Sequence, residues 1–362
     1  MGVTKNIAVL PGDGIGKEVI AEAIKVLKTI EEVFGHSFEY EYGLVGAAAI
    51  DETGNPYPEH TQKLCKSADA ILFGAIGDPK YDNDPSAKVR PEQGLLKMRG
   101  DLGLYSNIRP VASYEALYEK SPLKTDRIKG VDLVIFRELT GGIYFGQPRG
   151  TSEDGSKAFD TCVYSIEEIE RIAHQAFKAA QTRKKKVTLV DKANVIATSR
   201  LWRKTVTELA KEYPDVELDF MFVDNAAMKL IQQPSYFDVV LTENLFGDIL
   251  SDEASVIAGS LGLLPSASVG NQYSLFEPVH GSYPQVAGQN KANPMATILS
   301  AAMLLEYAFE LHEESTTIKN AVNEALALNK VTEDISSENA CTTSEVGSYI
   351  AEKIKEQVLA SA

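Results

Sequence analysis

The stretch "IAVLPGDGIGKEVIAEAIKVL", residues 7–27, decides how the chain begins to fold. Its apolar start predicts a buried β-strand, and the amphipathic run that follows predicts a helix over 17–34. Three glycines at alternate positions, G-x-G-x-G, join the two. The Rossmann fingerprint is G-x-G-x-x-G, and here Lys17 stands where its third glycine belongs. The spacing therefore argues against a Rossmann fold and favours a tight turn, whose backbone amides could still face an anionic or polar ligand.

The composition is that of a globular protein large enough for two domains. The chain has 362 residues, of which 44% are apolar and 24% charged. A net charge of −15 argues against nucleic acids and anionic membranes as partners. No apolar run approaches the ~20 residues that span a bilayer, and the N-terminus lacks a signal-peptide pattern. The three cysteines form no C-x-x-C motif, which is typical of a reducing compartment and argues against a zinc site, so we expect a cytoplasmic protein.

Strand-like and helical runs alternate through the first third of the chain, which predicts an α/β fold. Residues 77–91 are rich in Gly, Pro and Asp and predict a loop. Residues 141–165 carry glycine and polar breaks between short β-prone runs, and predict an irregular, protruding β excursion. Ser165 followed by Glu168 then predicts a capping box at the start of a helix.

Two aspartates four residues apart stand out in "FDVVLTENLFGDILSDEAS", residues 237–255. A buried strand leads there into a helix that begins near Glu243 or Asn244, so Asp248 and Asp252 share one helical face. Like charges at this spacing repel, and a solvated acidic face is one interpretation. Apolar residues are interleaved with the aspartates, however, so the helix is partly buried. A divalent cation explains two carboxylates on such a face, and ligands that are all oxygens would select Mg²⁺ or Mn²⁺.

Two further polar residues stand where apolar strands end. Asp224 lies between a strand and a helix in "FMFVDNAAMKLI", which is the usual place for sites in α/β proteins. Aspartate is also a good helix N-cap, so both interpretations remain open. Lys192 follows a strand in "VTLVDKANV", where it either works in a cleft or is an ordinary surface lysine.

Three arginines, Arg99, Arg109 and Arg137, lie in strands or near strand ends. Arg137 follows four apolar residues, and a buried guanidinium needs a polar partner. Because guanidinium groups bind carboxylates bidentately, three convergent arginines would suit a dicarboxylate, whereas each alone predicts a structural ion pair. Tyr144 follows two glycines in "TGGIYFGQ", where it either reaches into a cleft or packs in the core.

Taken together, these motifs make the chain resemble the β-decarboxylating dehydrogenases, the family of isocitrate and isopropylmalate dehydrogenases. The resemblance covers nearly the whole chain and rests on "LPGDGIG", "PEQGLLKMR", "SNIRP", "FRELTGGIYFG", "VDKANV", "VDNAAM", "TENLFGDILSDEAS" and "FEPVHGS…AGQNKANP", in that order. It implies an isopropylmalate-dehydrogenase-like α/β fold with two domains and a shared mixed sheet. The first domain would comprise 1–104 and 259–362, and the second 105–258. Residues 141–165 would form an arm that clasps a second subunit.

The resemblance also implies an activity. Family members oxidise a 2-hydroxy acid with NAD and then remove its 3-carboxylate. Within the family the chain is most similar to members that convert 3-isopropylmalate to 4-methyl-2-oxopentanoate in leucine biosynthesis. Alternatives are a relative acting on D-malate, tartrate or isocitrate, and a catalytically silent regulatory subunit. The complete set of candidate catalytic residues argues against a silent subunit.

The family's site residues can be carried over one by one. Asp224, Asp248 and Asp252 would bind Mg²⁺ or Mn²⁺, with Asp224 also facing the substrate. Lys192 would accept the hydroxyl proton and Tyr144 would protonate C3. Members are homodimers with shared active sites, so Lys192 and Asp224 would come from the partner subunit and the other three from the host chain.

The substrate pocket is implied in the same way. The three arginines would hold the carboxylates, and Glu92, Leu95, Leu96 and Val195 would face the variable substituent. Three apolar side chains suit an isopropyl group, and a carboxylate there would be desolvated without a partner. Glu92 would also repel it.

The implied cofactor site centres on the loop 277–293, with the loop 77–92 covering the nicotinamide. Its residues would be Ile15, Asp78, Glu277, His280, Gly281, Ser282, Gln285, Gly288 and Asn293, of which His280 and Asn293 face the adenine. Gln285 departs from the family, whose NAD-using members usually carry an acidic residue there. Its amide oxygen can still accept a hydrogen bond from the ribose, but repulsion of a 2′-phosphate is lost. NAD remains favoured because no Lys or Arg replaces the acid.

Overall fold

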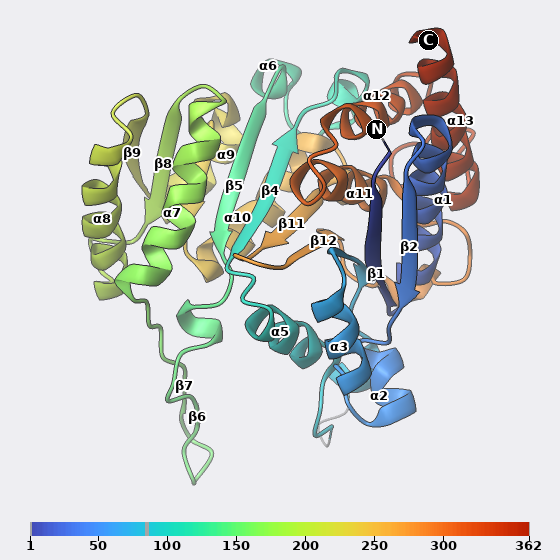
Figure 1. The fold of residues 1–362 in the computed structure, drawn as a ribbon. Helices are drawn as coiled ribbons and strands as arrows, with labels where there is room; N and C mark the ends of the chain where they lie inside the picture. The colour runs from blue at the N-terminus through green and yellow to red at the C-terminus, as the bar shows by residue number, and fades with distance from the viewer. Residues whose placement is uncertain (1, 84–86, 362) are drawn as a thin grey trace. The chain divides into compact units, whose positions relative to one another are not determined.

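The computed structural model describes residues 2–83 and 87–361, without the side chains of residues 82 and 361. The chain divides into two compact units (Figure 1). The first unit contains the chain up to Gly103, the segment Tyr114–Lys120 and the chain from Gly259 onward. The second contains Leu104–Ser113 and Ser121–Ala258. The segment Tyr114–Lys120, which the sequence analysis assigned to the second domain, groups with the first unit.

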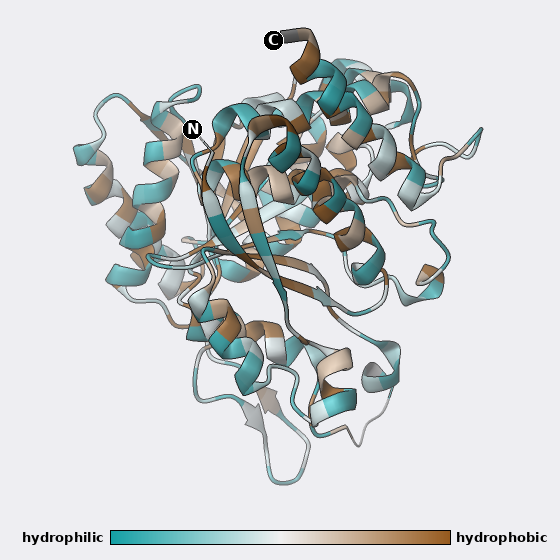
Figure 2. Cartoon of the chain, turned by 45° about the vertical axis from the view of Figure 1, so that its right-hand side comes forward, coloured by the Kyte–Doolittle hydropathy of each residue, from teal (hydrophilic) through white to brown (hydrophobic). Residues whose placement is uncertain are grey.

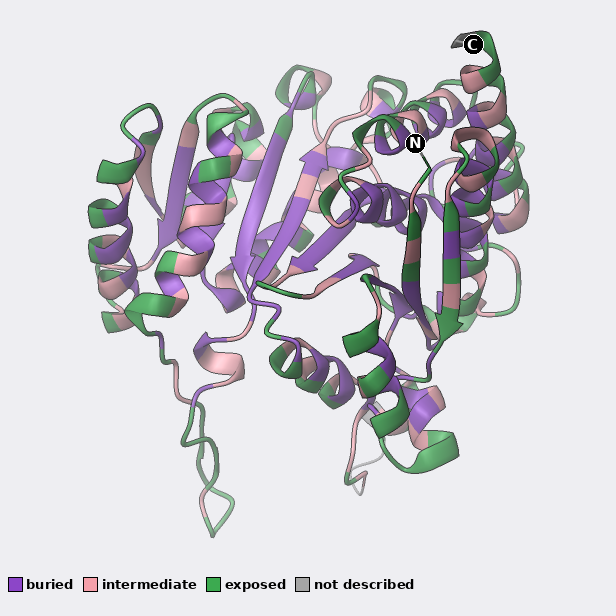
Figure 3. Ribbon diagram, viewed as in Figure 1, coloured by how far each residue is buried: buried purple, intermediate pink, exposed green. Residues whose placement is uncertain are grey.

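Four parallel strands and one antiparallel strand form the sheet of the first unit, which makes the sheet mixed. The order is β2 (Ser37–Tyr42), β1 (Thr4–Gly12), β3 (Ala70–Ala75), β12 (Ser274–Pro278) and the antiparallel β11 (Pro265–Val269). The helices are α1 (Gly16–Phe34), α2 (Ala47–Thr53), α3 (Glu59–Ser67), α4 (Pro79–Asp82), α5 (Pro91–Asp101), α11 (Met295–Tyr307), α12 (His312–Ala327) and α13 (Thr343–Ser361). Helices α1, α11, α12 and α13 pack on one another, and α11 is buried from Met295 to Leu305 because its sequence is apolar all round (Figure 3).

The second unit repeats this arrangement with its own five strands. The order is β4 (Ser106–Ala112), β5 (Asp132–Glu138), β10 (Val239–Thr242), β8 (Lys186–Asp191) and β9 (Glu217–Phe222), with only β4 antiparallel to its neighbour β5. Helices α7 (Ile166–Gln181) and α8 (Ala197–Leu209) cover one face, while α9 (Val223–Gln232) and α10 (Asn244–Ala258) cover the other (Figure 1). The short helix α6 (Thr125–Ile128) precedes β5. The α/β prediction is confirmed, and Figure 2 shows apolar strands between helices with hydrophilic outer turns.

The predicted β excursion and capping box are both confirmed. A small hairpin of β6 (Gly150–Thr151) and β7 (Ala158–Phe159) projects from the second unit with exposed residues on both strands (Figure 1). Ser165 Oγ then accepts the Glu168 N–H, and the Glu168 carboxylate accepts the Ser165 N–H, so α7 begins as expected. The clasping of a second subunit by the excursion stays a prediction.

The glycine turn between β1 and α1 is held by backbone hydrogen bonds. The amides of Asp13 and Ile15 donate to the carbonyls of Ala75 and Ser282, and the Gly16 amide donates back to Asp13 O. A Cβ on Gly16 would lie 2.0 Å from Pro11 O, so close backbone approach requires glycine there. The amides of Asp13, Ile15 and Gly16 therefore bond to protein carbonyls, and a ligand role for the other amides of this turn stays a prediction.

Asp13 connects three segments of the first unit. Its buried carboxylate accepts the N–H groups of Ala47 and Ala48, the first two residues of α2, and of Gly77, each at 2.9 Å. Gly77 opens the predicted loop 77–91. One helical turn, α4, interrupts that loop, and residues 84–86 lie outside the described part.

No helix within the described ranges 2–83 and 87–361 is both long and apolar enough to cross a membrane.

Asp13→Ala should lower the free energy of unfolding by about 3 kcal/mol, because three buried N–H groups lose their acceptor. Equilibrium unfolding in urea measures the change, with Glu338→Ala at an exposed position as the matched control. Equal stability of Asp13→Ala and the parent chain would show that the carboxylate does not hold these segments together.

Candidate active site

Helix α10 carries Asp248 and Asp252 on a face that meets two buried arginines of the same unit. Arg137, near the end of β5, is 2% exposed and donates through Nη1 to Asp248 Oδ1. Arg109 on β4 donates through Nη1 to Asp252 Oδ1 at 3.2 Å, and its Nη2 lies 4.0 Å from Asp248 Oδ1. These pairings offset the repulsion between the aspartates. The interpretation of a purely solvated acidic face is therefore wrong, although Asp252 remains largely exposed.

Neutral side chains hold the two guanidinium groups in place. Arg109 Nε donates to Asn107 Oδ1 at 2.7 Å, and its Nη1 also donates to Ser251 Oγ at 2.5 Å. Arg137 donates from Nε and Nη2 to Asn244 Oδ1, at 3.1 and 2.8 Å. The sequence analysis did not identify Asn107, Asn244 or Ser251 as part of the site. For Asn244, its place at the first turn after a buried strand was the available signal.

Tyr144 belongs to the same cluster. Its hydroxyl donates to Asp248 Oδ2 at 3.0 Å, and the Arg137 guanidinium lies 5.9 Å from its ring centroid. Burial and the neighbouring Asp248 carboxylate raise the pKa of Tyr144, so its hydroxyl stays protonated at neutral pH. At neutral pH the phenol therefore carries its proton and donates it in the hydrogen bond to Asp248.

The backbone turn that presents Tyr144 is fixed by a buried carboxylate. Glu138, at the end of β5, accepts the N–H groups of Thr140 and Gly141 at 3.1 and 2.7 Å. Arg171 on α7 donates to the same carboxylate at 3.1 Å. The sequence analysis missed Glu138, because a buried carboxylate is recognised from its partners and Arg171 lies on another element.

Lys192 and Asp224 form a second, separate pair. Lys192 follows β8, and its Nζ donates to Asp224 Oδ1 at 2.7 Å. This hydrogen bond lowers the pKa of Asp224. Asp224 is the second residue of α9, whose N-cap is Phe222, so the N-cap interpretation of Asp224 is wrong. Lys192 is therefore ion-paired, and its work in a cleft stays a prediction.

The described residues of one chain do not bring the predicted metal ligands together. Within the described residues, no three His, Cys, Asp or Glu side chains gather closely enough to hold a metal ion. Asp224 thus stands apart from Asp248 and Asp252. This agrees with a ligand set drawn from two subunits, which remains a prediction.

The remaining predicted substrate residues are divided between the units. Arg99 on α5 donates from Nη2 to Glu277 Oε1 at 2.9 Å, both in the first unit. Leu95 is buried, whereas Leu96 and Glu92 are partly exposed. Val195, in the second unit, is 67% exposed.

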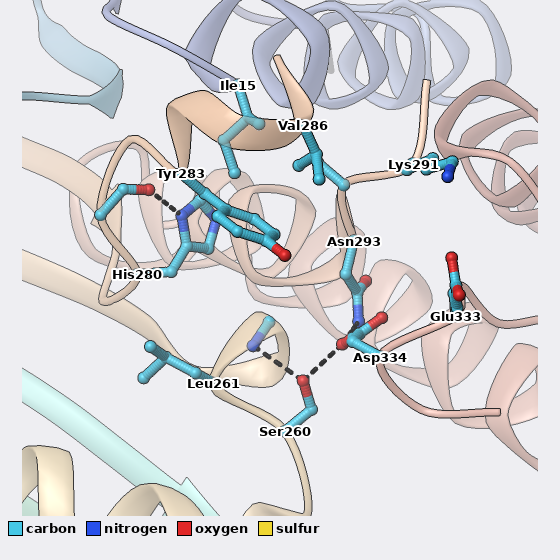
Figure 4. A pocket seen from close by; sticks show the side chains of 13 residues that line it. Ile15, Ser260, Leu261, His280, Tyr283, Val286, Lys291, Asn293, Glu333 and Asp334 are labelled. Atoms are coloured by element: carbon cyan, nitrogen blue, oxygen red, sulfur yellow. Dashed lines mark hydrogen bonds between the residues drawn. The ribbon is translucent and has the colours of Figure 1, made fainter. Parts of the chain in front are cut away.

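The first unit contains a cavity of about 560 Å³ (Figure 4). It is lined by Ile15, Ser260, Leu261, Gly262, His280, Gly281, Tyr283, Val286, Lys291, Ala292, Asn293, Glu333 and Asp334. Four predicted cofactor residues, Ile15, His280, Gly281 and Asn293, are among them. The lining residues do not include Asp78, Glu277, Ser282, Gln285 or Gly288. Asp78 caps α4 by accepting the Lys80 N–H at 3.0 Å, and Gln285 is exposed.

His280 lines this cavity with a neutral imidazole. Burial lowers the pKa of His280, so the imidazole is neutral at pH 7. Its Nδ1 lies 2.9 Å from Gly281 O, and a carbonyl only accepts, so the ring proton sits on Nδ1. Nε2 is then an acceptor, and it has no protein partner within the described residues.

Asn293 is held by protein groups on both sides of its amide. Its Nδ2 donates to Asp334 Oδ2 at 3.1 Å, and its Oδ1 accepts the Met295 N–H at 3.0 Å. Asp334 also accepts from Ser260 Oγ at 2.5 Å. Asp334, Ser260 and Tyr283 were missed, because they come from separate segments and carry no shared motif.

Comparison with known proteins identifies the family. The family model described as isocitrate/isopropylmalate dehydrogenase matches residues 6–350. The chain is 54% identical to the 3-isopropylmalate dehydrogenase of Bacteroides fragilis (strain YCH46) over 352 residues, which cover 97% of this chain and 99% of that protein. It is 57% identical to the 3-isopropylmalate dehydrogenase of Priestia megaterium over 340 residues, covering 93% and 92% of the two chains. The chain belongs to the isocitrate/isopropylmalate dehydrogenase family.

A solved structure shows the same fold. The isocitrate dehydrogenase of Methylococcus capsulatus superimposes with a TM-score of 0.88 at 34% identity, covering 97% of this chain and 99% of that one. The predicted fold class is confirmed, and a Rossmann fold is excluded.

A buried carboxyl lies at the start of α10, next to the candidate site. Glu243 is 8% exposed, and the Cys162 thiol donates to its Oε2 at 3.7 Å. Burial raises the pKa of Glu243 from 4.5 to about 7, and the Glu138 carboxylate also raises it.

Glu243→Gln should therefore stabilise the chain relative to the parent as the pH rises. The folded state prefers protonated Glu243. The contribution of Glu243 to the free energy of unfolding is therefore fully present below pH 4.5 and is lost as the pH rises through about 7. We expect the variant to gain about 3 kcal/mol on the parent between the two limits. Urea unfolding at about pH 4.5 and about pH 8 measures this, with Glu338→Gln as the exposed control. A difference independent of pH would contradict the assignment.

Proposed function

We propose that the chain catalyses the NAD-dependent oxidative decarboxylation of 3-isopropylmalate to 4-methyl-2-oxopentanoate, a step of leucine biosynthesis. The assignment of 3-isopropylmalate as the substrate rests on 54–57% sequence identity with 3-isopropylmalate dehydrogenases over nearly the full length of both chains. The polar cluster of the second unit supports the chemistry, since it combines guanidinium groups, carboxylates and a tyrosine hydroxyl. A relative acting on isocitrate, D-malate or tartrate is the alternative.

Arg109 and Arg137 are suited to bind substrate carboxylates. Both guanidinium groups are buried, and protein oxygens orient them in advance. A preorganised guanidinium loses little side-chain entropy when it binds a carboxylate. We assign Arg99 to the same role in the first unit, where Glu277 orients it.

The aspartates fit a hard divalent cation. Their donor set is made only of carboxylate oxygens, which Mg²⁺ and Mn²⁺ prefer, and no His or Cys belongs to it. Asp248 and Asp252 of one chain with Asp224 of a second would hold the ion. When bound, the ion supplies Lewis acidity at the substrate's hydroxyl and carboxylate oxygens.

Lys192 and Tyr144 are assigned the two proton transfers. Lys192 accepts the proton of the C2 hydroxyl as the hydroxyl becomes a ketone. Tyr144, whose hydroxyl is protonated at neutral pH, donates to C3 after the carboxylate leaves. Asp248 accepts a hydrogen bond from Tyr144 and so aims the phenol.

The apolar side chains of Leu95, Leu96 and Val195 are assigned to the isopropyl group. They offer no donor to a carboxylate in its place, and the partly exposed Glu92 adds a repulsive charge.

The cavity of the first unit fits the adenosine part of NAD. His280 Nε2, which has no protein partner among the described residues, is an acceptor for an exocyclic amine such as that of adenine, and Ile15 and Val286 offer apolar contact. When bound, NAD supplies the hydride acceptor.

We further propose a cytoplasmic homodimer with shared active sites. Exposed apolar side chains on α9 and α10, Met228 and Ile249, together with the exposed Val195, are suited to an interface. The β6–β7 hairpin would form part of it.

A substrate panel tests the function. With NAD and Mn²⁺ present, kcat/KM for 3-isopropylmalate should exceed that for isocitrate, D-malate and tartrate by about 100-fold, because a buried carboxylate or a missing apolar group costs that much. A preference for any of the other three acids would replace the proposed substrate.

Metal dependence gives a second prediction. A chelator should abolish activity, and Asp248→Asn should weaken Mn²⁺ binding by at least about tenfold, because the ion loses an anionic ligand. Mn²⁺ titration followed by electron paramagnetic resonance measures binding independently of turnover. Asp126→Asn, on the exposed helix α6, is the control. Full activity in chelator would refute the metal site.

Gln285 allows cofactor choice to be shifted. Gln285→Asp adds a charged acceptor for the ribose hydroxyls and a repulsive charge against a 2′-phosphate, so the NAD/NADP ratio of kcat/KM should rise about tenfold. The rise should come mainly from the KM for NADP. The neighbouring exposed Gln289 provides the control, Gln289→Asp. An unchanged ratio would show that Gln285 does not face the ribose.

A further inference from the structure

We propose that Asn244 is a positioning residue that aims both Arg137 and Tyr144 through its neutral amide. This inference rests on the proposed function, since it concerns groups that act on the substrate.

The side-chain amide and the backbone N–H of Asn244 all form hydrogen bonds, and the partners of the amide are a pure donor and a pure acceptor. It is 1% exposed, and its Oδ1 accepts from Arg137 Nε and Nη2 at 3.1 and 2.8 Å. Its Nδ2 donates to Gly141 O at 3.1 Å, and its backbone N–H donates to the Tyr164 hydroxyl at 2.9 Å. A guanidinium only donates and a carbonyl only accepts, so only one orientation of the amide fits.

These bonds close a ring around the candidate catalytic tyrosine. Arg137 reaches Asp248, Asp248 accepts the Tyr144 hydroxyl, and Tyr144 ends the single 3₁₀ turn Gly142–Tyr144. That turn begins directly after Gly141, whose carbonyl Asn244 holds. The amide therefore fixes the guanidinium and the phenol relative to each other.

The first turn of α10 lies directly on the Arg137 side chain. Asn244 opens that helix, and a Cβ on Gly247 would lie 2.5 Å from Arg137 Cγ. The arginine is thus held along its stem by Gly247 and at its nitrogens by Asn244. No rotamer change of Arg137 is possible without displacing α10 or breaking the amide contacts.

An amide has a property that an aspartate at the same position would lack. It accepts two N–H groups of Arg137 without adding negative charge next to Asp248, and it also donates to Gly141 O. An Asn244→Asp chain keeps the shape, loses the donor and places a second carboxylate on the same guanidinium. Electrostatic attraction for the substrate's carboxylates should then fall.

Steady-state kinetics test the proposal with two variants. Asn244→Ala should raise the KM for 3-isopropylmalate about tenfold and leave the KM for NAD within about twofold, because only the aim of Arg137 and Tyr144 changes. Asn244→Asp should raise the KM for 3-isopropylmalate further. The exposed Asn323→Asp on α12 adds the same charge as a control and should change neither constant. A purely structural role would lower kcat through the folded fraction and leave both KM values unchanged, which would overturn the proposal.

Hydrogen exchange separates this proposal from the proposed function. In Asn244→Ala, amides of residues 141–146 should exchange faster, while those of α1 in the first unit should not. This readout needs no substrate, so it stands even if the parent chain fails to oxidise 3-isopropylmalate, an outcome that would refute the proposed function alone. If Asn244→Asp does not fold, Asn244→Ala decides the question. Unchanged exchange at 141–146 would overturn the proposal.

Discussion

The second unit depends on the buried guanidinium of Arg137. A positive charge at a position only 2% exposed requires both charge balance and hydrogen-bond partners, or the residue could not be there. Asp248 supplies the charge and Asn244 the acceptor, and both stand on the first turns of α10. The requirement therefore fixes the helix against β5, brings Asp248 to the Tyr144 hydroxyl, and places an arginine, a carboxylate and a phenol together. The partners that stabilise the buried Arg137 therefore also form the proposed catalytic cluster.

In the first unit, hydrogen bonds from the glycine turn hold the segments around the proposed cofactor cavity. Asp13 ties the glycine turn to α2 and to Gly77, while the amide of Ile15 donates to Ser282 O, so the turn is fixed to the loop that carries His280. In this turn the amides of Asp13, Ile15 and Gly16 are bonded to protein carbonyls. In the proposed cofactor site, side chains would contribute to recognition, chiefly His280, whose Nε2 has no protein partner within the described residues.

The sequence predicted much of this and missed particular parts for physical reasons. Hydrophobic periodicity and apolar runs located β1, α1 and α10, and the alternate spacing of the glycines argued against a Rossmann fold, because these signals are local. Asp248 and Asp252 were found because like charges four apart on an apolar helix need an explanation. Asn244 and Glu138 were missed because a buried amide or carboxylate is recognisable only from its partners, and those come from other elements. For the same reason the sequence could not show that Asp224 pairs with Lys192 within the chain.

The central claim is that two chains complete one active site, since a single chain does not bring Asp224 to Asp248 and Asp252 among the described residues. Mixing two inactive variants tests it most directly. In a mixed dimer of Tyr144→Phe and Lys192→Met chains, one site would be intact and the other doubly altered, so random reassociation should restore about one quarter of the parent activity. If Tyr144 and Lys192 instead act within the same chain, every site keeps one altered residue. Activity no higher than that of the separate variants would contradict the account.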